Sequence, residues 1–75
     1  MDGLIKTLTY IGMDGWDRPV YADEYGHLWK DVDPRKGFQR NSNICSATNN
    51  DFNGEPDSPI SSIYGLQFVP ERVTW

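Results

Sequence analysis

Cysteine and long apolar runs are scarce in this chain, and each shortage removes a class of protein. A single cysteine, Cys45, cannot form an internal disulfide, which excludes the disulfide-stapled secreted mini-proteins. No apolar run approaches the roughly 20 residues that a membrane-spanning helix needs. The N-terminus lacks a signal-peptide pattern, because Lys6 directly follows Leu4 and Ile5. We therefore expect a cytoplasmic protein, and the length of 75 residues predicts one domain over residues 1–75.

Positive charge is also scarce, and much of it lies in one segment. The chain has seven Lys and Arg against eleven Asp and Glu, which gives a formal net charge of −4. Residues 34–43 hold three cations and no acid, a charge of +3 that leaves −7 for the rest of the chain. Because phosphate contacts need Lys and Arg, this balance disfavours direct nucleic-acid binding and favours a protein partner with a basic surface. The alternative is that the acidity only keeps a small protein soluble.

Groups that support catalysis are few. His27 is the only histidine, and the predicted sheet places it near Asp23 and Asp31. The scattered serines and threonines match no catalytic motif, and the residues around Cys45 match no cysteine-enzyme signature. We therefore expect a protein that is not an enzyme and that uses no cofactor. His27 is expected at the surface, and Cys45 is expected to be a small buried apolar side chain.

The segment after residue 48 has a partial likeness to a calcium-binding loop. Counted from Asn49, oxygen-bearing side chains stand at positions 1, 3, 5 and 9 of an EF-hand-like loop, with Gly54 at position 6. Position 12 is Ile60, where an EF-hand needs a bidentate glutamate, and no long helices are predicted on either side. We interpret residues 49–59 as an Asx-rich loop whose side chains bind its own backbone, and we predict no metal site.

The hydrophobic pattern predicts a small α+β or mainly β domain. It is an antiparallel meander of about four strands, with room for one short helix. The helix signals lie in residues 58–65, where Ser58 is a suitable N-cap and Gly65 a stop. Pro70 interrupts the last strand and favours an edge position for it. Residues 34–43 read as a polar loop, and residues 44–47 are too short to assign. The predicted strands are residues 4–13, 19–23, 27–32 and 66–75.

The segment Glu24-Tyr25-Gly26 predicts a three-residue hairpin loop that fixes a register between two strands. The register pairs Tyr21 with Trp29, so both rings share one face of the sheet. Together with Trp16, these rings form a candidate face for stacking on a sugar or another small ligand. The alternative is that a helix or the C-terminal segment covers the rings and makes them core.

Carboxylates gather at the turns and strand ends of the meander. Spaced carboxylates on a rigid sheet can imitate a phosphate backbone and occupy a basic groove of a protein. The alternative is that these aspartates only serve the turns in which they lie, because turns are rich in aspartate in any protein. A further alternative is an accessory domain whose basic loop, with Arg35, Lys36 and Arg40, touches nucleic acid or an acidic protein. The candidate partner-binding residues are Asp14, Asp17, Asp23, Glu24, Asp31 and Asp33, with Trp16, Tyr21 and Trp29.

Three stretches of the chain, residues 10–21, 49–57 and 68–75, together carry a resemblance. The pattern resembles small uncharacterised bacterial proteins of phages and other mobile elements, and it is similar to an accessory domain of large polyvalent proteins of such elements. The resemblance implies a context, a mobile element, rather than a mechanism. Small acidic proteins of such elements often inhibit host defence, as anti-CRISPR proteins do. By analogy with those proteins, the partner would have a basic nucleic-acid channel, as a nucleic-acid-guided nuclease has. It carries over no site residue.

Overall fold

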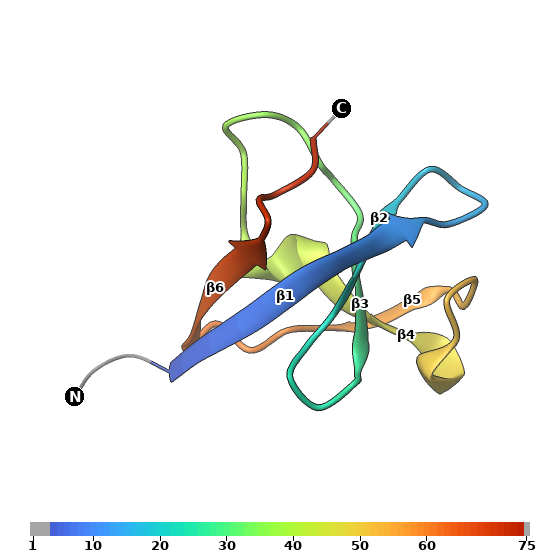
Figure 1. Ribbon diagram of the computed structural model, residues 1–75, viewed down its shortest axis with the longest axis horizontal. Coiled ribbons are helices and arrows are strands. Elements are labelled where there is room, and N and C mark those ends of the chain that lie inside the picture. Colours follow the sequence, from blue (N-terminus) through green and yellow to red (C-terminus); the bar gives the residue numbers. More distant parts are fainter. Residues whose placement is uncertain (1–3, 75) are drawn as a thin grey trace.

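The computed structural model describes residues 4–74 and has a mainly β fold (Figure 1). Six strands form one sheet in the order β5-β4-β3-β2-β1-β6. Neighbouring strands are antiparallel except β1 and β6, which run parallel. The prediction of a mainly β meander is therefore confirmed, with two more strands than expected. The strands are β1 (Leu4–Met13), β2 (Pro19–Ala22), β3 (Leu28–Asp31), β4 (Ile44–Ala47), β5 (Pro56–Pro59) and β6 (Tyr64–Val69).

The first three strands form the meander that the sequence predicts, and β1 has the predicted bounds. In the hairpin of β2 and β3, Tyr21 lies opposite Trp29 and Val20 lies opposite Lys30. Gly26 has a φ of 81°, the left-handed conformation that this turn requires, and its N–H donates to the carbonyl of Asp23. The turn thus fixes which side chains of both strands point into the core.

The second half of the chain corrects the prediction of a short helix over residues 58–65. Strand β5 extends to Pro59, the N–H of Ile60 donates to the carbonyl of Ile44 at 2.7 Å, and Gly65 lies inside β6 opposite Ile5. Prolines are accepted in β5 because it is an edge strand. Over residues 4–74 the helical elements are two short 3-10 turns, η1 (Asn41–Asn43) and η2 (Thr48–Asn50), and no helix is long and apolar enough to cross a membrane.

The aromatic face of the meander is the core of the molecule. Tyr21 is fully buried, and its ring packs edge-on against Phe68 of β6 with ring centroids 5.1 Å apart. The Tyr21 hydroxyl accepts a hydrogen bond of 2.9 Å from the N–H of Val73, which ties the C-terminal segment over the rings. Of the three candidate rings, the C-terminal segment thus covers that of Tyr21, whereas Trp16 stays exposed, so the alternative of a covered aromatic face holds only in part. The buried residues of this cluster are Leu8, Tyr21, Ile44 and Ile60.

The loop from η2 to β5 covers part of the opposite face of the sheet. Phe52 contacts Gly12 of β1, and the backbone carbonyl of Phe52 accepts a hydrogen bond of 2.7 Å from Lys30. A Cβ at Gly54 would collide with the carbonyl of Thr48, so the loop can close on itself only with glycine at this position. This loop is therefore packed against the sheet and has a defined conformation.

Candidate protein-binding surface

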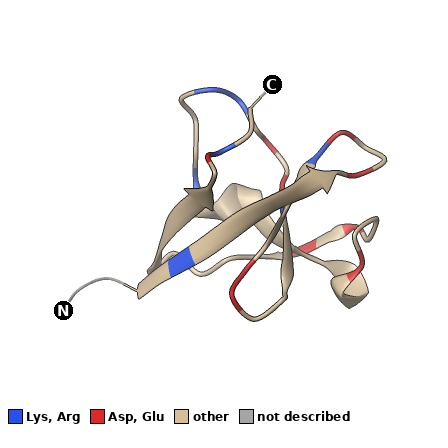
Figure 2. Cartoon of the chain, in the orientation of Figure 1, with Lys and Arg blue, Asp and Glu red and all other residues tan. Residues whose placement is uncertain are grey.

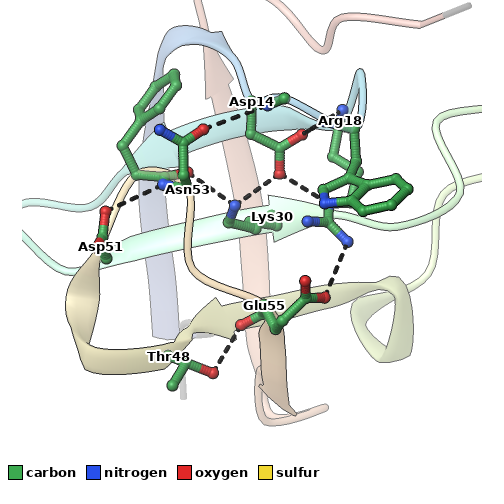
Figure 3. A network of polar contacts seen from close by, with 10 residues as sticks. Asp14, Arg18, Lys30, Thr48, Asp51, Asn53 and Glu55 are labelled. Atoms are coloured by element: carbon green, nitrogen blue, oxygen red, sulfur yellow. Dashed lines mark hydrogen bonds and ion pairs between the residues drawn. The ribbon is translucent and has the colours of Figure 1, made fainter.

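Asp14 is a buried carboxylate at the end of β1 that two cations neutralise (Figure 3). Its Oδ2 lies 2.6 Å from Nζ of Lys30 and 2.8 Å from Nε of Arg18. Its Oδ1 accepts the backbone N–H groups of Trp16 and Arg18, which closes the turn between β1 and β2. Burial alone would raise the pKa of Asp14, but the hydrogen bonds from Lys30 and Arg18 outweigh it and hold this pKa far below its usual range. Asp14 is thus a structural residue of the turn.

Asp23 closes the turn between β2 and β3 in the same way. Its Oδ1 accepts the backbone N–H groups of Tyr25 and His27. Its Oδ2 accepts the indole N–H of Trp29 at 3.0 Å and pairs with Nζ of Lys6 at 3.2 Å. Burial opposes ionisation of Asp23, but these hydrogen bonds prevail and lower its pKa.

Asp31 is the third buried carboxylate, and its partner comes from the end of the chain. Nε of Arg72 donates to Asp31 at 3.2 Å. The same guanidinium donates to the backbone carbonyls of Asp33, Arg35 and Phe38 at 3.2, 3.0 and 2.9 Å. Burial raises the pKa of Asp31, and the contact with Arg72 opposes that rise. Arg72 therefore joins the C-terminal segment to the loop that follows β3.

These contacts correct the expectation of one exposed array of six meander carboxylates. Asp14, Asp23 and Asp31 lie inside, because each is needed to neutralise a lysine or arginine that the fold buries. The aromatic candidates divide in the same way. Tyr21 is core and Trp29 is half-buried, so neither offers a free ring face beside the exposed Trp16. The predicted residues that remain at or near the surface are Trp16, Asp17, Glu24 and Asp33.

The burial of the ion pairs decides which charges remain at the surface, and Figure 2 shows where the charged residues lie along the chain. Four cations and three carboxylates pair inside, a net +1, so the formal charge of −4 leaves −5 for the rest of the chain. Within residues 4–74, every exposed Asp or Glu lies outside the loop of residues 35–40, and every exposed Lys or Arg lies inside it. The inward cations are Lys6, Arg18, Lys30 and Arg72, and the exposed acids are Asp17, Glu24, Asp51, Glu55, Asp57 and Glu71.

Hydrogen bonds hold the acid-bearing loops side by side. The η2–β5 loop reaches the β1–β2 turn, where the N–H of Gly15 donates to Asn53 and Arg18 lies 3.7 Å from Glu55. It also reaches the β2–β3 turn, where Asn50 accepts from the N–H of Leu28 at 2.7 Å. Direct contacts therefore join three loops that are distant in the sequence.

We define the acidic loop surface by six exposed residues of these three loops. Two of them are aromatic: Trp16 is 71% exposed and Tyr25 is 77% exposed, each next to an exposed acid in the sequence. Exposed Trp and Tyr side chains are typical of protein-binding surfaces. Sequence reasoning did not select Tyr25, although its place at the tip of a hairpin loop was a usable signal. The six residues are Trp16, Asp17, Glu24, Tyr25, Asp51 and Glu55.

The loop of residues 35–40 carries the opposite charge. The guanidinium groups of Arg35 and Arg40 lie 4.1 and 4.8 Å from the centre of the Phe38 ring. Arg35 also forms two hydrogen bonds of 2.8 Å with Asp33, and this pairing lowers the pKa of Asp33. Because Arg72 holds three carbonyls of this segment, the basic loop has a defined shape.

The remaining candidate groups have local structural partners. His27 is exposed, with Nδ1 3.9 Å from Asp23, and Cys45 is buried with Sγ 3.8 Å from the carbonyl of Ser42. In the Asx-rich loop, Asp51 accepts from the N–H of Asn53. Residues 4–74 contain no group of three His, Cys, Asp or Glu side chains placed to hold a metal ion.

The pKa shifts predict that acid weakens the fold. Asp14 and Asp23 have lower pKa values in the folded chain than the ordinary value of 3.8, so their stabilisation is present above that value and is lost progressively as the pH falls from it toward the lowered pKa values. Asp31 has a raised pKa and acts in the opposite direction. We expect the melting temperature to fall below about pH 5 in a circular-dichroism series. Asp23→Asn should flatten the curve and Asp57→Asn should not, and a constant melting temperature from pH 7 to about pH 3 would contradict this assignment.

Comparison of the chain with protein-family models, with curated proteins and with solved structures finds no match.

Proposed function

We propose that this chain is a non-enzymatic protein-binding module that docks its acidic loop surface on a basic surface of a partner protein. The observation that carries the proposal is that most cations lie inside the fold, whereas most acids lie at its surface. Within the described residues, the fold turns four of its seven cations inward, and the exposed ones lie in a single loop. A surface of one sign attracts a partner of the opposite sign and accelerates their association.

The sharper form of the proposal is an acidic inhibitor of a cytoplasmic nucleic-acid-binding effector, in the manner of an anti-CRISPR protein. Carboxylates held on hydrogen-bonded loops keep a fixed spacing, and a fixed row of negative charge can occupy a groove that otherwise holds phosphates. The exposed rings of Trp16 and Tyr25 add apolar contact area at two points of the same surface. The resemblance to proteins of mobile elements supports the same class of partner.

The test is the fourfold variant Asp17→Asn, Glu24→Gln, Asp51→Asn and Glu55→Gln. All four side chains are exposed, so the variant should fold. The tagged chain is incubated at low salt with bacterial lysate that expresses candidate effector nucleases, and the captured proteins are identified by mass spectrometry. We expect the native chain to capture a nucleic-acid enzyme that high salt or its own DNA or RNA releases. The variant should bind this enzyme at least about tenfold more weakly.

The matched control is Lys36→Gln with Arg40→Gln, which neutralises two exposed cations of the basic loop. This control should still capture the partner. Loss of capture in the control, with retention in the fourfold variant, would contradict the proposal. It would favour the accessory-domain interpretation, in which the basic loop makes the contact.

The sugar-binding alternative loses its platform in this fold. It needs three exposed rings, and only Trp16 of the three is exposed. No observation in the described residues favours it over protein binding.

A further inference from the structure

The two edge strands of the sheet have opposite chemistry. Strand β5 consists of Pro-Asp-Ser-Pro, and proline and charge are the devices that keep an edge from pairing with another strand. Strand β6 consists of Tyr-Gly-Leu-Gln-Phe-Val, with no proline and no charged residue. One edge of the sheet is therefore blocked and the other is open.

The backbone of β6 has hydrogen-bonding groups that face away from β1. Tyr64 directs its carbonyl outward, where Asn41 donates to it at 2.7 Å, and its N–H donates to Ser61. Alternation along a parallel strand turns the N–H and C=O groups of Leu66 and Phe68 to the same side. Within residues 4–74, β1 is the one strand that pairs with β6, so these groups are available to another strand.

Exposed apolar side chains also lie near this open edge. Four of the nine large exposed apolar residues lie on the part of β1 that pairs with β6, on β6 itself or in the turn that leads into β6. The end of the Ile5 side chain lies over Gly65, so apolar surface extends across β6 toward its edge. The one charged residue of β1, Lys6, is buried against Asp23. The four are Leu4, Ile5, Ile63 and Val69.

We propose that β6 pairs antiparallel with β6 of a second copy and forms a closed symmetric dimer with a continuous sheet. Pairing through β6 brings no two charged side chains of this strand together, because β6 contains none, so the like net charge of two copies opposes it least there. The acidic loop surface belongs to the hairpin turns and the η2–β5 loop (Figure 2), and it contains no residue of β6. Because β5 is blocked, growth stops at two copies rather than continuing as a fibre. This inference goes beyond the proposed function and does not depend on it.

The test is sedimentation equilibrium of the full chain over a range of concentrations, at low and at high salt. We expect a dimer whose dissociation constant is insensitive to salt, since no charged residue of β6 takes part. Gln67→Lys places an exposed charge at the middle of β6, where the two copies would oppose each other, and it should weaken the dimer roughly tenfold or more. Ser58→Lys is the matched control, because it places the same charge on β5, and it should leave the dimer unchanged.

Three outcomes would overturn the dimer. The native chain could remain monomeric up to millimolar concentration. The association could weaken steeply with salt, which would indicate contact between the basic loop of one copy and the acidic loop surface of another. Loss of the dimer in Ser58→Lys, with its retention in Gln67→Lys, would place the contact at β5. None of these results would change the capture of a partner by the acidic loop surface, so failure here and failure of the proposed function are distinguishable.

Discussion

Replacement of Asp14 with alanine is expected to lower the free energy of unfolding by about 3–5 kcal/mol, because it leaves a buried lysine without its counter-ion. Lys30 and Asp14 both have fully buried side chains and lie 2.6 Å apart. The same change also removes the acceptor of two backbone N–H groups in the β1–β2 turn. A domain of this size has a total stability of about 5–15 kcal/mol, so the variant should be partly unfolded near physiological temperature.

Urea denaturation followed by tryptophan fluorescence measures this effect. The control is Asp57→Ala, an exposed carboxylate on β5, which should shift stability by less than about 0.5 kcal/mol. The double variant Asp14→Asn with Lys30→Met removes both charges and should recover part of the loss. If Asp14→Ala behaved like the control, the carboxylate would have to be hydrated in solution, and the assignment of Asp14 and Lys30 as a buried ion pair would be wrong.

The second large effect is expected for Arg72→Met, at about 3 kcal/mol or more. Methionine keeps much of the aliphatic stem but leaves Asp31 buried without its cation. It also removes a donor from three backbone carbonyls, of which only that of Arg35 keeps another, the N–H of Phe38. Urea denaturation at pH 7 gives the loss of stability. Because Asp31 already has a raised pKa, the stability difference between the variant and the native chain should narrow as the pH falls and this carboxyl takes up a proton.

The conservative change Arg72→Lys separates charge from geometry. Lysine restores a positive charge near Asp31 but cannot reach three carbonyls at once, so it should recover only part of the stability. Amide hydrogen exchange in residues 33–40 should be faster in both variants, because Arg72 holds the carbonyls of Asp33, Arg35 and Phe38. Unchanged exchange there would show that the loop keeps its shape without Arg72.

The first half of the fold could be predicted because its signals are local. The turn at Gly26 needs a left-handed residue, and a three-residue loop permits one register, so the pairs of β2 and β3 follow. Strand β5 could not be predicted in the same way. Its four residues include two prolines and no apolar alternation, and only pairing with β4 makes them a strand.

The carboxylates of the meander were misplaced for a related reason. An aspartate in a turn looks the same in a sequence whether it meets water or a buried lysine. One local signal did exist, because the predicted register puts Lys30 opposite Val20 on an apolar face, and a buried lysine needs an acid. That signal indicates that Lys30 has an acidic partner, but it does not identify Asp14, which is 16 residues away in the sequence.

The division between inward and outward carboxylates bears on how the sequence can change over time. Asp14, Asp23 and Asp31 each satisfy a cation and backbone groups, so a substitution at any of them is penalised by loss of the fold itself. Asp17, Glu24, Asp51 and Glu55 stand on the outside of the same loops, where replacement has a smaller effect on stability than at the buried carboxylates. The proposed contact surface can therefore change to follow an altered partner while the six-stranded sheet beneath it stays constant.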